Sequence, residues 1–388
     1  MGIAGLPRLA LALVAAVALA TAAGLIAFWP DGSTDAKLAE TLRPPTFGAE
    51  VVAVRAAGCE FPTAERCMTV AARLTDGPDE GRMASFPTGA TAGDPAFVPG
   101  DAVLLASTGP EAATQGMSPY AFVDYERRDP MLWLLVGFIV VVIVFGRRRG
   151  LLSLVGLAAS IAVIVVFLVP AILDGRPPLA VALTAAFAVM LLTLGLAHGV
   201  GAKSVAAALG TSACLLLTAL LAVLFTKLAN VSGFSSEEAV LLQDAADILS
   251  IQGLVIAGIV IGALGVLDDV TVSQASAVLA LRRADPTLPF DRLYREAIDI
   301  GRDHVAATVN TLVLAYVGAS LPILLVFAVG DTPFGEAVNR EAVSETIVGT
   351  LVGSIGLIAA VPLTTAVAAG LAVRMRGLPP RDAHAHIH

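Results

Sequence analysis

The chain has 388 residues, of which 57% are hydrophobic and 14% are charged, and its mean hydropathy is +0.83. A soluble domain carries about 25% charged residues, so this composition argues against a water-soluble enzyme and indicates a protein that lies in a lipid bilayer. The net charge of −8 and the pI near 5.1 provide no basic surface of the kind that binds nucleic acid.

Eight apolar runs are long enough to cross a bilayer, since a transmembrane helix needs roughly 17 to 25 apolar residues. They predict an all-α polytopic membrane protein with about eight transmembrane helices, placed at residues 9–28, 130–146, 150–173, 178–200, 205–226, 252–270, 308–329 and 346–373. The first run, within 1–30, is either a membrane anchor or a signal peptide cleaved near Ala20-Thr21-Ala22. Its length of about 20 residues favours an uncleaved anchor.

The basic residues orient these helices, because short loops rich in Lys and Arg stay in the cytoplasm. With the N-terminus inside, residues 147–149 and 282–283 and the tail 374–388 lie in the cytoplasm. The short outer loops then hold only Arg176, Lys227 and Arg340. We therefore expect both termini to be cytoplasmic.

Residues 31–129 form a polar stretch long enough for a separate domain between the first two helices. Alternating apolar residues at 50–57, 67–74 and 101–107 predict short strands, and hence a small extracytoplasmic β-barrel or sandwich. Cys59 and Cys67 can oxidise to a disulfide there, or remain two unlinked thiols. The domain either binds a protein partner or a ligand, or only tethers the flanking helices.

The sequence lacks the common signatures of membrane enzymes. It has no HExxH motif, and GVGAKS at 199–204 fails the phosphate-loop pattern because Ala197 and Ala202 occupy the two glycine positions. The tail histidines at 384, 386 and 388 are more typical of a solvated tail than of a metal site. We therefore expect no enzyme activity, no cofactor and no bound metal.

A cluster of ionisable residues near the cytoplasmic ends of the last three helices is the candidate functional site. Asp268 and Asp269 end the run 252–270, and charge in a bilayer is retained mainly for function or when paired. The alternative is that Thr271 and Gln274 form a capping box, with the two acids in water at a helix start.

The approach to the seventh run adds further polar residues. The segment 290–304 has apolar residues at helical spacing, which predicts an amphipathic helix on the inner membrane face. Arg302 and Asp303 either neutralise each other or meet Asp268 and Asp269. His304 and Asn310 follow, as interhelical hydrogen-bonding groups or as the lining of a polar path. Close helix packing is predicted at Gly258, Gly262, Gly349 and Gly353.

The chain resembles YibE/F family membrane proteins. The resemblance covers roughly 130–373 and rests on GLLSLVGLAAS at 150–160, LAHGVGAKS at 196–204, IGALGVLDDVTVSQASAV at 261–278, GRDHVAATVNTLVLAYVGASLP at 301–322 and GSIGLIAAVPLTTA at 353–366. It implies a multi-pass protein of the bacterial inner membrane, with a seven-helix membrane domain over 130–373 and no established substrate.

Two functions fit these features. The first is a permease or transport-associated protein in which the cluster of Asp268, Asp269, Arg302, Asp303, His304 and Asn310 responds to protons or ions. The second is a scaffold without transport activity, embedded in the lipid bilayer, that displays the external domain to a protein partner.

Overall fold

The computed structural model describes residues 6–32, 45–57, 66–90, 96–108, 118–236, 239–242 and 250–375. The chain forms two compact units. Lys37–Phe145 contains the β-strands, and Met1–Ala36 together with Gly146–His388 forms a helical unit.

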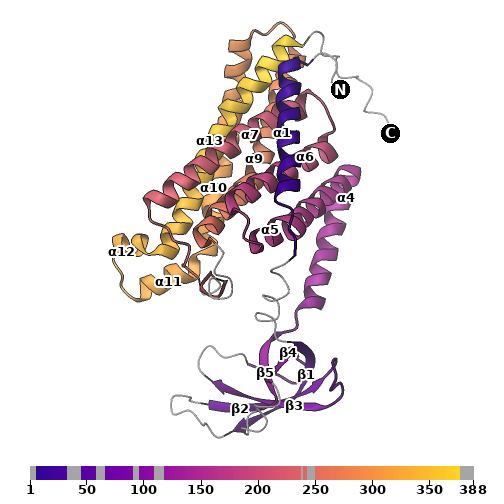
Figure 1. The fold of residues 1–388 in the computed structure, drawn as a ribbon, viewed down its shortest axis with the longest axis vertical. Coiled ribbons are helices and arrows are strands. Elements are labelled where there is room, and N and C mark those ends of the chain that lie inside the picture. Colours follow the sequence, from indigo (N-terminus) through magenta and orange to yellow (C-terminus); the bar gives the residue numbers. More distant parts are fainter. Residues whose placement is uncertain are drawn as a thin grey trace. The chain divides into compact units, whose positions relative to one another are not determined.

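The strands form a five-stranded antiparallel sheet in the order β3-β2-β1-β4-β5 (Figure 1). Their bounds are Thr46–Ala57 for β1, Arg66–Leu74 for β2, Met83–Ala90 for β3, Ala102–Ser107 for β4 and Tyr120–Tyr125 for β5. The sheet is strongly curved, because Phe86 on one edge strand stacks on Phe122 of the other, with ring centroids 5.9 Å apart. The predicted β-rich domain is thus a single curled sheet around an aromatic core, and not two packed sheets.

The remaining elements are helices, and most of the long ones are apolar enough to cross a membrane. Their bounds are Arg8–Ala27 for α1, Arg128–Val163 for α4, Ile164–Leu168 for the π-helix η1, Val169–Leu173 for α5, Pro178–His198 for α6, Ala202–Leu228 for α7, Ile251–Ala284 for α9, Phe290–Ala319 for α10, Leu321–Val329 for α11, Phe334–Asn339 for α12 and Glu341–Arg374 for α13. Helix α4 begins in the β-containing unit and continues into the helical unit. Within this unit α1 begins and α13 ends at the same end (Figure 1).

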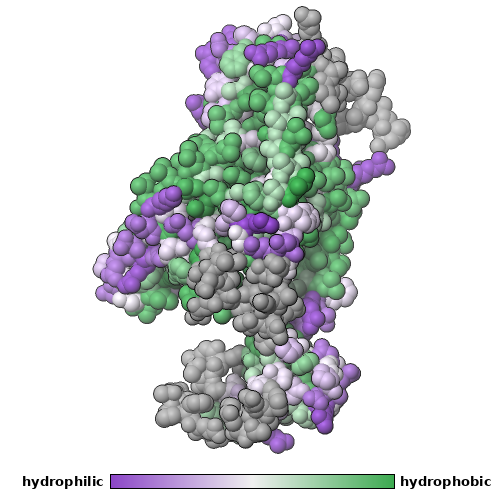
Figure 2. All heavy atoms as spheres, in the orientation of Figure 1, coloured by the Kyte–Doolittle hydropathy of each residue, from purple (hydrophilic) through white to green (hydrophobic). Residues whose placement is uncertain are grey.

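Helices α7, α9 and α13 pack most closely and form the centre of the unit, with α1, α6 and α10 around them. Apolar side chains cover much of the outer surface of these helices (Figure 2). Because lipid is as apolar as leucine, packing in a bilayer depends on small residues that allow close approach. Gly210 on α7 meets Thr364 of α13, and Gly356 on α13 meets the Thr218 hydroxyl of α7.

The C-terminal end of α1 and the residues that follow it contact other parts of the helical unit. Gly24 of α1 packs on Thr184 of α6. Beyond the helix, the backbone N–H groups of Asp31 and Gly32 donate to Asp174 Oδ2 at 2.7 and 3.2 Å. The N-terminal helix is therefore an integral part of the bundle.

The number of membrane-capable helices differs from the predicted eight. Within the described chain there are six such helices, or seven if the pair α10 and α11, bent by 59°, counts as one span. The runs 130–146 and 150–173 follow each other without a loop and together form one helical stretch, Arg128–Leu173. This stretch contains a kink at Arg147, whose φ of 49° and ψ of −129° are not helical. The run 308–329 is interrupted between α10 and α11 by Ser320.

Candidate functional site

Asp268 lies near the middle of α9, at its contact with α6. One carboxylate oxygen, Oδ2, accepts a hydrogen bond from the Thr193 hydroxyl of α6 at 3.0 Å. The other, Oδ1, is buried and has no hydrogen-bond partner among the described residues. A buried acceptor without a partner costs about 1–3 kcal/mol, and more when it is charged. This oxygen is therefore available to a proton, an ion or a moving side chain.

A pair of threonine hydroxyls extends the polar region toward α7. Thr271 of α9 lies one turn after Asp268, and its hydroxyl is 2.6 Å from that of Thr211 on α7. The Thr271 hydroxyl also donates to the Asp268 carbonyl at 3.1 Å. Asp268 thus lies where α6, α7 and α9 meet, among hydroxyl groups that can each donate or accept.

The capping-box interpretation of Thr271 and Gln274 is wrong, because α9 continues unbroken through both residues to Ala284. Gln274 is buried and links three helices. Its amide donates to the Ala297 carbonyl of α10 at 2.7 Å and to the Thr365 hydroxyl of α13 at 2.6 Å.

Asp269 does not share the environment of Asp268. Adjacent helical residues are about 100° apart around the axis, so the two carboxylates point in different directions. Asp269 is exposed and lies within electrostatic range of His198 at the end of α6. Asp268 is therefore the sheltered member of the pair.

The structure does not bring the predicted α10 residues to Asp268. Arg302 pairs with Asp299 one turn earlier at 2.9 Å, and the two side chains are 73% and 70% exposed. Asp303, His304 and Asn310 are also exposed. Among the described residues, no hydrogen bond or ion pair joins this group to Asp268 or Asp269. The predicted six-residue cluster is wrong in this respect.

The reason is that α10 packs through a different face. Its buried residues are Leu293, Ala297 and Gly301, at a spacing of four. A Cβ on Gly301 would lie 2.5 Å from Val361 Cγ1 and 2.7 Å from Gln274 Oε1, so this glycine sets the approach of α10 to α9 and α13. The charged residues that follow Gly301 consequently face outward.

The predicted packing glycines fall into two groups. Gly349 and Gly353 are buried on α13, and a Cβ on each would make ordinary contacts with Ile259 and Leu312 respectively. Gly258 and Gly262 on α9 are exposed, and a Cβ on Gly258 would meet nothing within 4 Å. The packing role predicted for Gly258 is therefore wrong.

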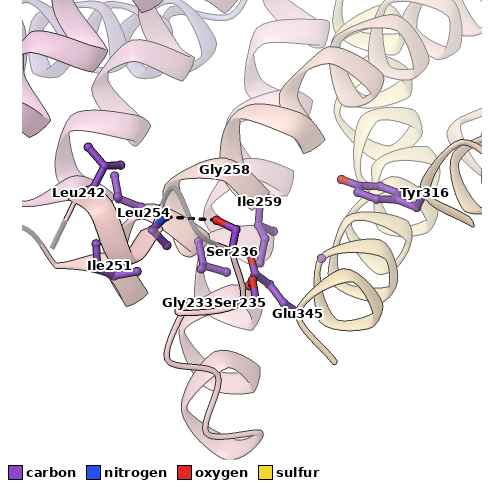
Figure 3. A pocket seen from close by; sticks show the side chains of 13 residues that line it. Gly233, Ser235, Ser236, Leu242, Ile251, Leu254, Gly258, Ile259, Tyr316 and Glu345 are labelled. Carbon is purple, nitrogen blue, oxygen red and sulfur yellow. Dashed lines mark hydrogen bonds between the residues drawn. The ribbon is translucent and has the colours of Figure 1, made fainter. Parts of the chain in front are cut away.

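Gly258 instead lines a pocket of about 490 Å³ between α9, α10, α13 and the segment that precedes α9 (Figure 3). The Tyr316 hydroxyl points from α10 toward α9, where a Cβ on Gly262 would lie 3.5 Å from it. Glu345 Oε2, from the first turns of α13, accepts a hydrogen bond from Ser235 at 2.6 Å. The other lining residues are mostly apolar side chains.

Glu341 holds the wall of this pocket in place. Its Oε1 atom accepts from the Ser232 backbone N–H and hydroxyl, both at 2.6 Å, and from the Gly233 N–H at 2.7 Å. Three donors on one carboxylate oxygen fix the segment after α7 against the start of α13. Sequence reasoning missed Glu341, Glu345 and Tyr316, because their relation depends on four separate elements.

The cysteine prediction falls partly outside the described residues. Cys67 lies on β2, opposite Ala57 of β1 and Gly89 of β3. Cys59 is not among the described residues, so the Cys59–Cys67 pairing stays a prediction. Within the described chain, no group of three or more His, Cys, Asp or Glu side chains is placed to hold a metal ion.

Residues 134–374 match the family described as YibE/F-like protein, which is well over half of the chain. The chain belongs to this family. The matched region begins early in α4 and ends with α13, so the YibE/F-like segment contains both Asp268 and the pocket at Glu345. No curated protein and no solved structure matches the chain.

Proposed function

We propose that this YibE/F-like protein is a transport protein of the bacterial inner membrane, and not an enzyme, in which protonation of Asp268 alters the contact between α6, α7 and α9. The observation that supports it is the buried Oδ1 atom of Asp268, for which the described part of the apolar bundle provides no hydrogen-bond partner. A charged group within the bilayer costs about 2.5–3.5 kcal/mol on insertion scales, so such groups mark ion and proton pathways.

Protonation changes what Asp268 can bond. The ionised carboxylate only accepts hydrogen bonds, whereas the protonated form also donates one. The Thr193 hydroxyl can reorient to match either form, because a hydroxyl is both donor and acceptor. Protonation thus removes the buried charge and changes the hydrogen bond between Asp268 of α9 and Thr193 of α6.

The test is proton flux into vesicles. The full chain is reconstituted into lipid vesicles that contain a trapped pH-sensitive dye, and a pH gradient is imposed. Asp268→Asn should reduce flux to that of protein-free vesicles, whereas Asp269→Asn should retain it. The neighbouring aspartate is a matched control because the same chemical change is made one residue away, at an exposed position.

The result also separates transport from scaffolding. Wild-type flux equal to that of protein-free vesicles, or wild-type flux in Asp268→Asn, would refute the proposal. The scaffold alternative is favoured by a different observation, the separate hydrophobic core of the β-unit around Val51, Val70 and Phe86. It predicts no protein-dependent flux and capture of a partner by the β-unit.

A further inference from the structure

The pocket of Figure 3 is distinct from the Asp268 site. Gly258, on its wall, precedes Asp268 by ten residues, which is about 15 Å along a helix. Its volume of about 490 Å³ falls within the roughly 300–1,000 Å³ of small-molecule sites. The pocket is large enough for a molecule of one or two rings.

Its walls combine apolar surface with one negative charge. Ile251, Leu254 and Ile259 of α9 supply apolar side chains, and Glu345 is the single charged residue among those that line the pocket. Ser235 holds Glu345 Oε2 at 2.6 Å and leaves the other carboxylate oxygen without a bond to a described residue. Tyr316 adds an aromatic side chain to the lining.

A negative charge in an otherwise apolar wall raises the local concentration of cations. Because Glu345 is the single charged residue among those that line the pocket, the electrostatic preference of the pocket is for a cation.

We propose that this pocket binds a small apolar molecule that carries one ammonium group, with the ammonium on the Glu345 carboxylate and the apolar part against α9. This names the class of solute for the transport proposed above, but it rests on the pocket and not on Asp268. Binding is measured without flux, so failure of one proposal is distinguishable from failure of the other.

The probe is tritiated 2-phenylethylamine, bound to the full chain in lipid nanodiscs. Excess 2-phenylethanol and 3-phenylpropanoate, the neutral and anionic counterparts, should compete at least about tenfold more weakly, because neither pairs with a carboxylate. Equal competition by the anion would overturn the proposal.

Two matched pairs of variants locate the binding. Glu345→Gln keeps an acceptor for Ser235 and should weaken amine binding at least about tenfold. Glu336→Gln, at an exposed glutamate paired with Arg340, should leave it unchanged. Equal affinity in Glu345→Gln and the wild type would refute the charge pairing.

The second pair tests the cavity itself. Gly258→Leu fills the pocket, and Gly265→Leu places the same side chain at another exposed α9 position; neither glycine has a neighbour within 4 Å of an added Cβ. Gly258→Leu should abolish amine binding while Gly265→Leu retains it. Binding that survives Gly258→Leu comes from elsewhere and overturns the assignment.

Discussion

The contact between α7 and α13 at Gly210 gives a prediction of stability. A Cβ added at Gly210 would lie 3.0 Å from Thr364 Cβ and 3.2 Å from its backbone Cα. Rotating the Thr364 side chain cannot relieve a contact with its backbone, so Gly210→Ala forces the two helices apart. Overpacking of this kind costs about 1–3 kcal/mol.

A second glycine separates this cost from helix propensity. Alanine favours a helix over glycine by about 0.5–1 kcal/mol, and this gain applies equally to Gly265→Ala, where the added Cβ meets nothing within 4 Å. Gly265→Ala should therefore be neutral or slightly stabilising. Gly210→Ala should be less stable than Gly265→Ala by about 1–3 kcal/mol.

The chain contains its own reporter for this measurement. Cys214 of α7 is a buried free thiol. A thiol-reactive dye added to the detergent-solubilised protein labels Cys214 as the bundle unfolds, which gives the melting curve. Equal stability of Gly210→Ala and Gly265→Ala would refute the close approach of α7 and α13. Thr364→Ala should partly restore the stability of Gly210→Ala, because it removes the hydroxyl that meets the new methyl group.

Three further predictions concern the β-unit and the break in α4. The Tyr120 hydroxyl, 2.7 Å from Asp79, lowers the pKa of that carboxyl below its ordinary value. This stabilisation is present above the ordinary pKa of an aspartate and is lost as pH falls through the lowered folded-state pKa. Asp79→Asn should therefore lower the melting temperature of the β-unit at pH 7, as followed by tyrosine fluorescence. The difference in melting temperature from the wild type should vanish in acid. A difference that stays constant with pH would contradict the prediction. A disulfide between Cys59 and Cys67 would leave one free thiol in the denatured, unreduced chain. After treatment with a thiol-alkylating reagent, mass spectrometry should therefore find one alkyl group on the wild type and two on Cys59→Ser. Three alkyl groups on the wild type would disprove the bond. Arg147, with φ 49°, adopts a conformation that favours glycine, so Arg147→Gly should raise the unfolding free energy in a denaturant titration by up to about 1 kcal/mol, whereas a loss of stability would contradict the strain.

Much of the architecture could be predicted along the chain. The apolar runs identified α1, α6, α7, α9 and α13, because length and hydropathy are properties of a single segment. The breaks were harder to predict. Whether Arg147 or Ser320 bends a helix or ends it depends on the backbone angles of one or two residues and on what packs beside them.

In the candidate site, too, the properties of a single segment could be predicted and the contacts between segments could not. The cost of charge in lipid pointed to Asp268 and Asp269, and the structure shelters Asp268 but leaves Asp269 exposed. Its partners were not predictable, since Thr193 lies 75 residues away on α6 and resembles any other membrane threonine in the sequence. Arg302 and His304 were mistaken for partners, because amphipathic spacing shows which residues share a face but not which face is buried.

The sequence by itself determined that this is a multi-helix membrane protein with a β-rich domain and two costly carboxylates, Asp268 and Asp269, because composition, hydropathy and strand alternation are local quantities. Only the tertiary structure decided that Asp268 faces Thr193, that α10 packs through Gly301, and that Glu345, Tyr316 and Gly258 enclose a pocket. The physical reason is that small residues set how closely helices approach and with what rotation. The distance and the rotation between two helices depend on both contacting surfaces, and the sequence of a single helix describes only one of these surfaces.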